Sequence, residues 1–484
     1  MYYALSMYFA NGGGPCFIVS VGTYNLTTPA ISKSVFGPAL TALDNVDEPT
    51  LLVFPDAVNL TKSADYYDIL VEALLQCENR GDRFLLCDVY KGDGSAPTAV
   101  ADFREGIGAN SLKYAAAYYP FLKTSMGFFY NAGSVTFNHN NGGLLNGLKL
   151  SDVQAIIAAS AELARATGFQ GQINAAPVAD AIELGIRTAR AAVAAVAAVV
   201  KAYLLNNPTE PEPSQALKNA QTAANDALAT AKAATTKTGN GSATEAADAA
   251  VNAAQAAIGQ ATLNAIDLAA LNALYTPAFE GRMNQLISEP TVVLPPTPAV
   301  AGIYARVDRT RGVWKAPANV SLARVIKPTV AISDESQRSL NVDDTSGKSV
   351  NAIRSFTGKG ILVWGARTLD GFSNEWRYVN VRRLFNMVEE SLKKSTAQFV
   401  FEPNDANTWA KVKAMCENFL TLLWRQGALA GAKTEHAFRV YVGLNETMSA
   451  DDILNGRLII EIHMAAVRPA EFIVLRFAHK MQES

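Results

Sequence analysis

The sequence predicts a mixed α/β (α+β) protein with three parts: a body built on a parallel-type sheet, an inserted Ala-rich helical module, and a C-terminal region with a long helix and antiparallel strands. Within the first 130 residues, short apolar runs alternate with helical segments. This alternation is typical of a parallel sheet that helices cover on both faces. From about residue 151 to residue 273 alanine dominates, and after residue 290 the composition becomes mixed again.

Three strands and two helices are predicted in the first 130 residues. The predicted strands are Cys16–Val21, Thr50–Phe54 and Arg83–Val89, and the predicted helices are Ala39–Asp44 and Ser63–Asn79. In the longer helix, apolar residues recur every three or four positions and therefore share one face. Gly81 comes just after it, and glycine is the usual residue at a helix end because it adopts a left-handed backbone without steric cost.

Four helices are predicted in the Ala-rich segment, because alanine is the strongest helix former. They cover about 151–167, 177–205, 214–237 and 242–274. Three prolines in the linker 206–213 separate the second helix from the third. We interpret residues 150–275 as a helical module inserted at the periphery of the body. A low-complexity spacer is the alternative interpretation.

Beyond residue 290, the pattern predicts the rest of the body and a C-terminal domain. The run 358–364 reads as a buried strand, and the amphipathic segments Val379–Ala397 and Asn404–Gly427 read as helices. The final part predicts an antiparallel meander of three strands, Ala437–Val442, Arg457–Val467 and Glu471–Ala478. The expected domains are residues 1–130 with 295–380 as the body, 150–275 as the helical module, and 381–484 as the C-terminal domain.

Composition and charge argue against several classes of function. Apolar residues form 49% of the 484 residues and charged residues only 18%, which is typical of a folded protein. The 42 basic and 44 acidic residues give a net charge of −2, without the basic excess of a nucleic-acid-binding protein. The most apolar run, Ala191–Val200, has half the length that a bilayer span requires. We therefore expect no nucleic-acid partner and no direct membrane insertion.

Motifs for cofactors and metals are weak. The four cysteines and four histidines are scattered, without the spacing of metal ligands. The string Thr345–Ser349 (TSGKS) resembles the end of a phosphate-binding loop, but Val342 occupies the position of the first required glycine. No cofactor, metal or catalytic residue is assigned on this basis.

Asp56 and Asp88 are the remaining candidates for chemistry. Each lies at the carboxyl end of a predicted parallel strand, where open α/β sheets place acid–base groups. Turn formation or helix capping is the other role that aspartates take at such positions. An α/β hydrolase that uses these two carboxylates is therefore an alternative function.

Several long strings resemble those of contractile tail sheath proteins, which occur in contractile-tailed phages, in R-type tailocins and in phage-like extracellular injection systems. The strings follow the family's order over nearly all of residues 1–130 and 295–484, whereas the Ala-rich segment has no counterpart. They are YFANGGG (8–14), FREGIGANSLKYAAAYYPFL (103–122), GIYARVDRTRGVWKAPAN (302–319), ILVWGARTLDG (361–371), WRYVNVRRLFNMVEESL (376–392), FVFEPNDANTWAKV (399–412), FLTLLWRQGALAGAKTEHAF (419–438) and PAEFIVLRF (469–477).

The resemblance implies a structural protein that is not an enzyme. Sheath subunits form six-fold rings that stack helically around a rigid inner tube, between baseplate and terminal cap proteins. The extended sheath is metastable, and when the baseplate opens it shortens and drives the tube through a target envelope. The resemblance therefore implies assembly in the bacterial cytoplasm, as part of a phage tail or of a released extracellular particle. Phage, tailocin and injection system remain alternatives.

Two sets of residues are candidate contact sites under this resemblance. Family members contact the tube through a helix of the C-terminal region, and the charged face of Asn404–Gly427 would supply Lys411, Lys413, Glu417 and Arg425. Extended termini link neighbouring subunits in the family. The printed sequence begins almost at the region that follows the family's N-terminal arm, so only a C-terminal link is assigned. It comprises the strand region Glu471, Phe472, Ile473, Val474, Leu475, Arg476 and Phe477, with the tail after it.

Overall fold

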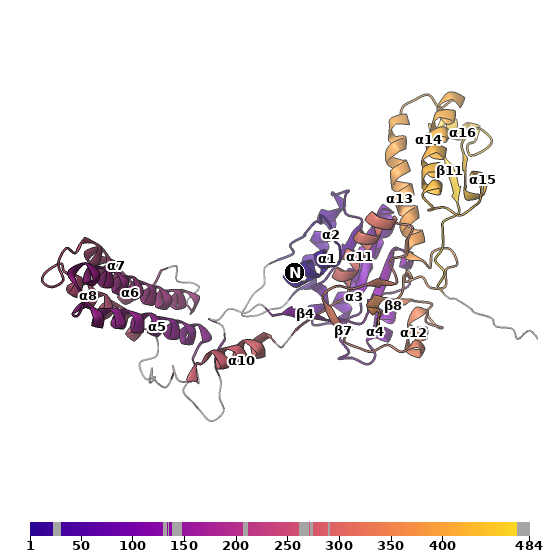
Figure 1. Cartoon of the computed structure of the whole chain (residues 1–484). Helices are drawn as coiled ribbons and strands as arrows, with labels where there is room; N and C mark the ends of the chain where they lie inside the picture. Colours follow the sequence, from indigo (N-terminus) through magenta and orange to yellow (C-terminus); the bar gives the residue numbers. More distant parts are fainter. Residues whose placement is uncertain are drawn as a thin grey trace, which may run out of the picture. The chain divides into compact units, whose positions relative to one another are not determined.

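The computed structural model describes residues 1–22, 31–128, 133, 135–137, 148–206, 212–260, 271, 274–288 and 291–471. The chain divides into two compact units. One unit comprises Met1–Met126 with Thr291–Ser484, and the other comprises Gly127–Pro290. Both are drawn in Figure 1, where the second unit carries the labels α5 to α8.

A six-stranded sheet forms the centre of the first unit, in the order β1-β2-β3-β8-β9-β6. The first four strands of this order, β1, β2, β3 and β8, run parallel to one another. Strand β9 is antiparallel to β8, and β6 is antiparallel to β9. The parallel-type body is thus confirmed. The bounds are Leu51–Val53 (β1), Phe84–Asp88 (β2), Ala115–Tyr119 (β3), Val320–Ser321 (β6), Val350–Phe356 (β8) and Gly360–Val363 (β9). A smaller sheet, β5-β4-β7, consists of Thr291–Leu294 (β5), Leu122–Gly127 (β4) and Val325–Pro328 (β7).

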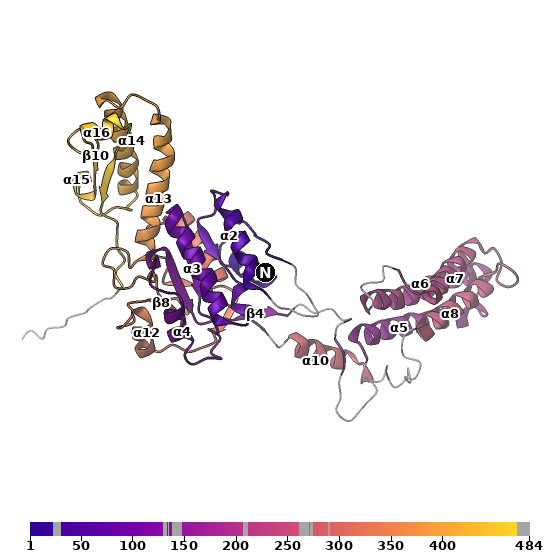
Figure 2. The same cartoon turned by 180° about the vertical axis from the view of Figure 1, so that it is seen from behind.

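Helices cover both faces of the six-stranded sheet. One face packs against α2 (Phe36–Asp44), α3 (Ser63–Arg80) and α4 (Ala99–Gly106), and the other against α1 (Tyr2–Ala10) and α11 (Thr297–Arg311). The views from opposite sides in Figures 1 and 2 show α11 and α3 on different faces. Strand β2 is buried along its whole length because it lies between these two layers. A short helix, α12 (Asp334–Asn341), precedes β8.

The predicted helix Ser63–Asn79 is confirmed as α3. Its apolar residues, among them Ile69, Leu70 and Leu74, are buried against the sheet. Gly81 ends the helix with a φ of 75°, in the left-handed region where a side chain would be strained. The prediction succeeded here because both signals, the helical period and the terminal glycine, are local in sequence.

The predicted strand Cys16–Val21 is wrong. These residues form no strand, and Phe17 and Ile18 are 59% and 55% exposed. They line a groove of about 830 Å³ together with α2 and the edge strand β1. An apolar, β-branched run is a strand only where a neighbouring strand supplies hydrogen-bond partners, and composition carries no information on that neighbour.

The second unit is a bundle of Ala-rich helices. Its long helices are α5 (Leu150–Ile173), α6 (Val178–Asn206), α7 (Gln215–Ala233) and α8 (Ala243–Gln260), followed by α10 (Pro277–Ser288). Alanines such as Ala192, Ala224 and Ala254 fill the core, so that the helices can approach closely. Helix α5 continues beyond the predicted end at residue 167, because Ile173 is buried against Ala181 and Ala247. Most of the proline linker, 207–211, lies outside the described residues.

The C-terminal region packs two helices on a two-stranded antiparallel sheet. Its elements are α13 (Val379–Thr396), α14 (Ala406–Arg425), α15 (Thr434–Ala437), β10 (Phe438–Tyr441), α16 (Ala450–Leu454) and β11 (Glu461–Met464). The apolar faces predicted for both long helices are confirmed, since Leu384, Val388, Val412 and Leu420 share one core. Helix α13 also contributes Val379 to the core of the body. It therefore joins the C-terminal region to the body.

Candidate functional site

Helix α14 carries the predicted tube-facing residues, and the structure divides them into two pairs. Lys411 and Arg425 are exposed, whereas Lys413 and Glu417 are half-buried. At about 100° per residue, the second pair falls at the margin of the apolar face and the first pair opposite that face. All four side chains remain candidates, but only Lys411 and Arg425 lie on the outermost stripe of the helix.

Sequence reasoning missed the rest of this stripe. Ala414, Asn418 and Leu422 are exposed and follow Lys411 at spacings of three or four residues. Leu422 is 57% exposed, although it sits among charged and polar residues. The stripe is thus mostly uncharged, with one cation towards each end. The sequence did carry a signal for this stripe in Leu422. An apolar residue opposite the apolar face of an amphipathic helix has no partner in its own fold, which indicates a contact with another molecule.

A second exposed apolar surface lies where α13 gives way to α14. Phe401 is 103% exposed and has a φ of 71°, which is strained for an aromatic residue, and Val400 beside it is 62% exposed. Asn404 donates to the carbonyl of Arg457 at 3.0 Å, which ties this loop to the loop after α16. Leu454, the last residue of α16, is 83% exposed. Nothing in the amino-acid pattern separates these residues from ordinary core positions.

The predicted C-terminal link falls mostly outside the described residues. Strands β10 and β11 pair in antiparallel register over four residues each, which confirms two of the three meander strands. Strand β11 is half-buried, since Ile462 and Met464 face the core and Glu461 and His463 are exposed. Phe472, Ile473, Val474, Leu475, Arg476 and Phe477 lie outside the described residues.

Glu471 is the last described residue, and it is not in a strand. Its carboxylate accepts hydrogen bonds from Arg367, with distances of 2.8 Å from Nε to Oε1 and 2.6 Å from Nη2 to Oε2. The Tyr378 hydroxyl donates to the same Oε2 at 3.1 Å. Burial, together with the charge of Glu471, raises the pKa of Tyr378, so the hydroxyl stays protonated and continues to donate.

A partly buried ion pair joins the C-terminal region to the body, with the Arg383 side chain 9% exposed and the Asp308 side chain 30% exposed. Arg383 of α13 donates to both carboxylate oxygens of Asp308 on α11, at 2.9 and 2.5 Å, and its guanidinium lies 4.9 Å from the ring centroid of Tyr304. One residue earlier, Arg382 stacks 4.2 Å from the ring centroid of Trp376 and donates to Asn386 and Glu389. The orientation of α13 on the body therefore depends on planar guanidinium contacts as well as on apolar packing.

The two candidate catalytic aspartates have different surroundings. Asp88, at the end of β2, is 2% exposed and accepts hydrogen bonds from the backbone N–H and the hydroxyl of Thr297, at 2.9 and 2.5 Å. Thr297 is the first residue of α11, so this carboxylate caps a helix. Burial raises the pKa of Asp88 to about 7. Asp56, which follows β1, lies 3.2 Å from the amino group of Met1. Neither contact resembles a catalytic pair.

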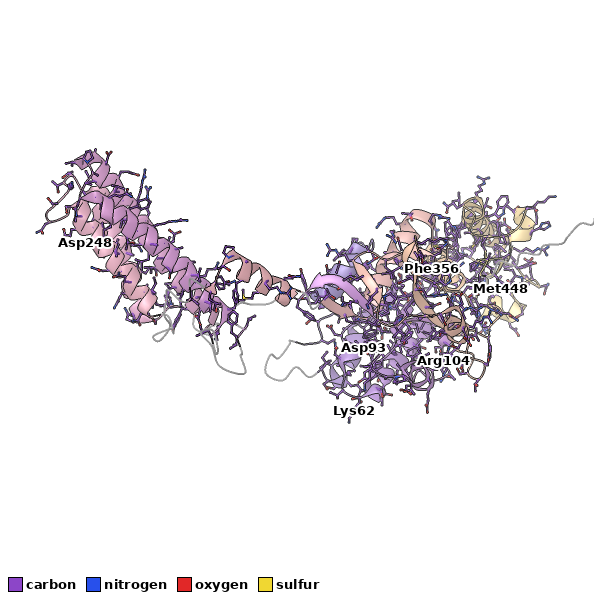
Figure 3. All side chains as sticks on the ribbon, turned by 60° about the horizontal axis from the view of Figure 1, so that its bottom comes forward. Lys62, Asp93, Arg104, Asp248, Phe356 and Met448 are labelled. Carbon is purple, nitrogen blue, oxygen red and sulfur yellow. The ribbon has the colours of Figure 1, made fainter. Side chains whose placement is uncertain are left out.

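The string that resembles a phosphate-binding loop has a structural role. The Lys348 ammonium is 7% exposed and donates to the backbone carbonyl of Arg104, which is labelled in Figure 3. Asp343 accepts from the backbone N–H and the hydroxyl of Ser346, both at 2.6 Å. Among the described residues, no cluster of three or more metal-ligating side chains is present, and no helix is long and apolar enough to span a bilayer.

Comparison with known proteins connects this arrangement to a family. The phage tail sheath C-terminal domain matches residues 373–480, which include α13, α14, β10, β11 and Glu471. The tail sheath protein of Burkholderia phage BcepMu is 31% identical over 138 residues, 28% of this chain and 28% of that protein. The tail sheath protein of Enterobacteria phage T4 is 25% identical over 181 residues, 37% of this chain and 26% of that protein. These alignments therefore span less than a third of either relative.

The fold is matched over a longer stretch. The helical sheath of the anti-feeding prophage (AFP), solved in its contracted state, aligns with a TM-score of 0.53 and 26% identity, over 99% of this chain and 82% of that chain. Its resemblance extends beyond the C-terminal domain to the α/β body. The chain therefore carries a phage tail sheath C-terminal domain, and in its related sequences and its fold it is similar to contractile tail sheath proteins.

Proposed function

We propose that this chain is the structural subunit of a contractile sheath. In this proposal, six-fold rings of the chain stack around an inner tube, and contraction from a metastable extended state drives the tube through a target envelope. The observation that carries the proposal is the match of nearly the whole chain to a contracted helical sheath, together with the sheath C-terminal domain. An open helical assembly of this kind needs contacts between unlike surfaces, and in this proposal α14 and the residues after Glu471 supply them.

The proposed partners are further copies of the chain, the inner tube protein, the baseplate and the terminal cap. Assembly in the bacterial cytoplasm, in a phage tail or in a released particle, is part of the same proposal. Electron microscopy of the chain expressed with its neighbouring genes tests it, since rods or tubes are expected. Only small dispersed particles would contradict it.

A hydrolase that uses Asp56 and Asp88 is the second candidate, and the observed contacts weigh against it. Both oxygens of the Asp88 carboxylate are engaged by Thr297 in a buried helix cap. A general base needs its carboxylate within reach of a substrate proton. Loss of a measurable hydrolytic turnover in Asp88→Asn would favour this alternative.

Two truncations are expected to separate folding from assembly. Truncation after Lys480 should leave a soluble chain that forms no long sheaths, because it removes only the end of the proposed link. Truncation after Ala470 should also lower the soluble yield, because Arg367, which is 7% exposed, then loses its carboxylate partner. Soluble yield and sheath length in electron micrographs are the measurements. Full-length sheaths from the first truncation would contradict a C-terminal link.

Charge reversal on α14 is expected to weaken attachment to the tube. Lys411→Glu should loosen the sheath or block its growth on the tube, because Lys411 lies on the exposed stripe. Exposed ion pairs contribute about 0–1 kcal/mol each and are screened by salt, so the difference between the variant and the wild type should shrink as the salt concentration rises. Lys413→Glu is the matched control, with a smaller expected defect, since Lys413 is half-buried at the margin. Equal numbers of extended particles in the wild type and Lys411→Glu would remove the claim.

Deletion of the helical unit is expected to leave assembly intact. We propose that residues 150–275 form a peripheral outer module, because the described helices of this unit have their own alanine core. Replacement of Gly127–Pro290 by a short Gly/Ser linker should therefore still give sheaths of normal length. Sheath length and diameter are measured by electron microscopy. Complete loss of sheaths, with the shortened chain still folded, would show that the unit takes part in the ring.

A further inference from the structure

The carboxylate of Glu471 is held by two side chains of the body, Arg367 and Tyr378. Arg367 binds its carboxylate side-on, with Nε 2.8 Å from Oε1 and Nη2 2.6 Å from Oε2, and Tyr378 adds a third donor. The Arg367 side chain is 8% exposed and that of Glu471 is 20% exposed, so water screens the pair only weakly. Charge-assisted bidentate pairs of this geometry are the strongest class of side-chain hydrogen bond.

Arg367 is itself fixed to the centre of the body. Its backbone N–H donates to Oδ1 of Asn351, and its carbonyl accepts from Nδ2 of Asn351, both at 2.8 Å. The same Nδ2 donates to the carbonyl of Ala117 at 3.0 Å. Asn351 lies on β8 and Ala117 on the neighbouring strand β3, in the middle of the parallel sheet. Gly365 allows this approach, because a Cβ there would lie 2.7 Å from Oδ1 of Asn351.

The described contacts of the chain between β11 and Glu471 are neutral hydrogen bonds, without an ion pair. Ala465 donates to the carbonyl of Ala437 at 2.8 Å and accepts from Ala430 at 2.7 Å, and Val467 donates to the carbonyl of Ala428 at 3.2 Å and accepts from Asn380 at 3.1 Å. Among the described strands, β11 pairs with β10 alone, and it has exposed residues at alternate positions. A two-stranded sheet is marginally stable on its own, so this sheet depends on its packing against α13 and α14. A force applied to the chain between β11 and Glu471 would break these hydrogen bonds one after another.

We propose that Arg367 and Tyr378 hold Glu471 as an anchor that carries mechanical load from the C-terminal tail to β3 and β8. This inference rests on the proposed function, in which the residues after Glu471 link neighbouring subunits. When those subunits move during contraction, a pull on the tail reaches Glu471 before it reaches β11. The anchor passes the pull through Arg367 and Asn351 to the central strands, so that the β10–β11 sheet is protected from peeling.

A single-molecule pulling experiment on the full chain tests the anchor. Cys16 is exposed whereas the other three cysteines are buried, so handles are placed on Cys16 and on Ser484→Cys. Glu471→Gln keeps the shape of the side chain but removes its charge, and neutral hydrogen bonds are roughly half as strong as charge-assisted ones. The force of the first rupture should therefore fall about twofold. Tyr378→Phe, which removes one donor, should lower this force less.

Two controls separate load-bearing from general stability. With the second handle moved to Lys433→Cys, the path of force bypasses Glu471, and Glu471→Gln should leave the first rupture unchanged. Asp334→Asn makes the same chemical change at the ion pair of Arg354, which lies on β8 but outside the path of the tail. It should leave the rupture force unchanged with either pair of handles.

The particle supplies the second measurement. Sheaths of Glu471→Gln should assemble but break into fragments when they contract, whereas wild-type sheaths stay continuous. An unchanged rupture force through Ser484→Cys would overturn the anchor. A lowered force with continuous contracted sheaths would overturn its load-bearing role. Failure of the proposed function is recognised separately, because the wild-type chain would then form no sheaths while the pulling experiment still decides the anchor.

Discussion

Asp308→Asn is expected to lower the free energy of unfolding of the first unit by about 3 kcal/mol. Arg383 is 8% exposed, and Asp308 is the acidic partner of its guanidinium, at 2.9 and 2.5 Å. Without that carboxylate, α13 would have to bury a cation with no opposite charge. Removing one member of a buried pair costs more than the pair itself contributes, because the remaining charge has lost its hydration. Chemical denaturation followed by circular dichroism measures the loss.

The matched control for this variant is Asp68→Asn. Asp68 pairs with Lys33 on the surface of the same unit, where the two side chains are 56% and 37% exposed. An exposed pair contributes about 0–1 kcal/mol, so the control should unfold almost as the wild type does. Equal losses in the two variants would mean that the Arg383 contact with Asp308 does not hold α13 on the body.

Asp88→Asn is expected to flatten the pH dependence of stability. The pKa of Asp88 is raised from 3.8 to about 7 by burial in the folded chain. A carboxyl group whose pKa is raised by folding stabilises the fold while it is protonated. Its contribution is complete below the unfolded pKa and is lost as the pH rises through about 7. One pKa unit corresponds to about 1.4 kcal/mol, so the total loss is on the order of 4 kcal/mol.

The measurement compares the free energy of unfolding at about pH 5 and about pH 8 in both proteins. The wild type should lose more stability than Asp88→Asn over this interval, because an amide has no proton to lose. The Asn side chain retains an oxygen that can accept from the Thr297 N–H, so the helix cap is largely kept. The same pH dependence in both proteins would show that Asp88 already titrates near its ordinary pKa in the fold.

The sequence alone determined those parts of the structure whose causes are local. The helical period of α3, its terminal Gly81 and the apolar faces of α13 and α14 are each set within one or two turns of chain. The apolar run of β2 predicted a buried strand, because a strand covered on both sides has no polar alternation. The strings that resemble sheath proteins indicate the family without any information on the fold. The sequence did not show that Lys413 and Glu417, half of the predicted tube-facing set, lie at the margin of the apolar face of α14. Charge alone does not separate the outer stripe of a helix from its margin.

Only the tertiary structure decided which distant residues meet. Asp88 and Thr297 are 209 positions apart, and Arg367 and Glu471 are 104 apart. No local pattern marks one arginine among many as the partner of one particular carboxylate, because the pairing depends on how strands and helices are placed after the chain folds back. The same reason explains the failure at Cys16–Val21. Its residues favour a strand, but a strand forms only where a neighbouring strand supplies hydrogen-bond partners. Whether such a neighbour is present depends on the tertiary structure.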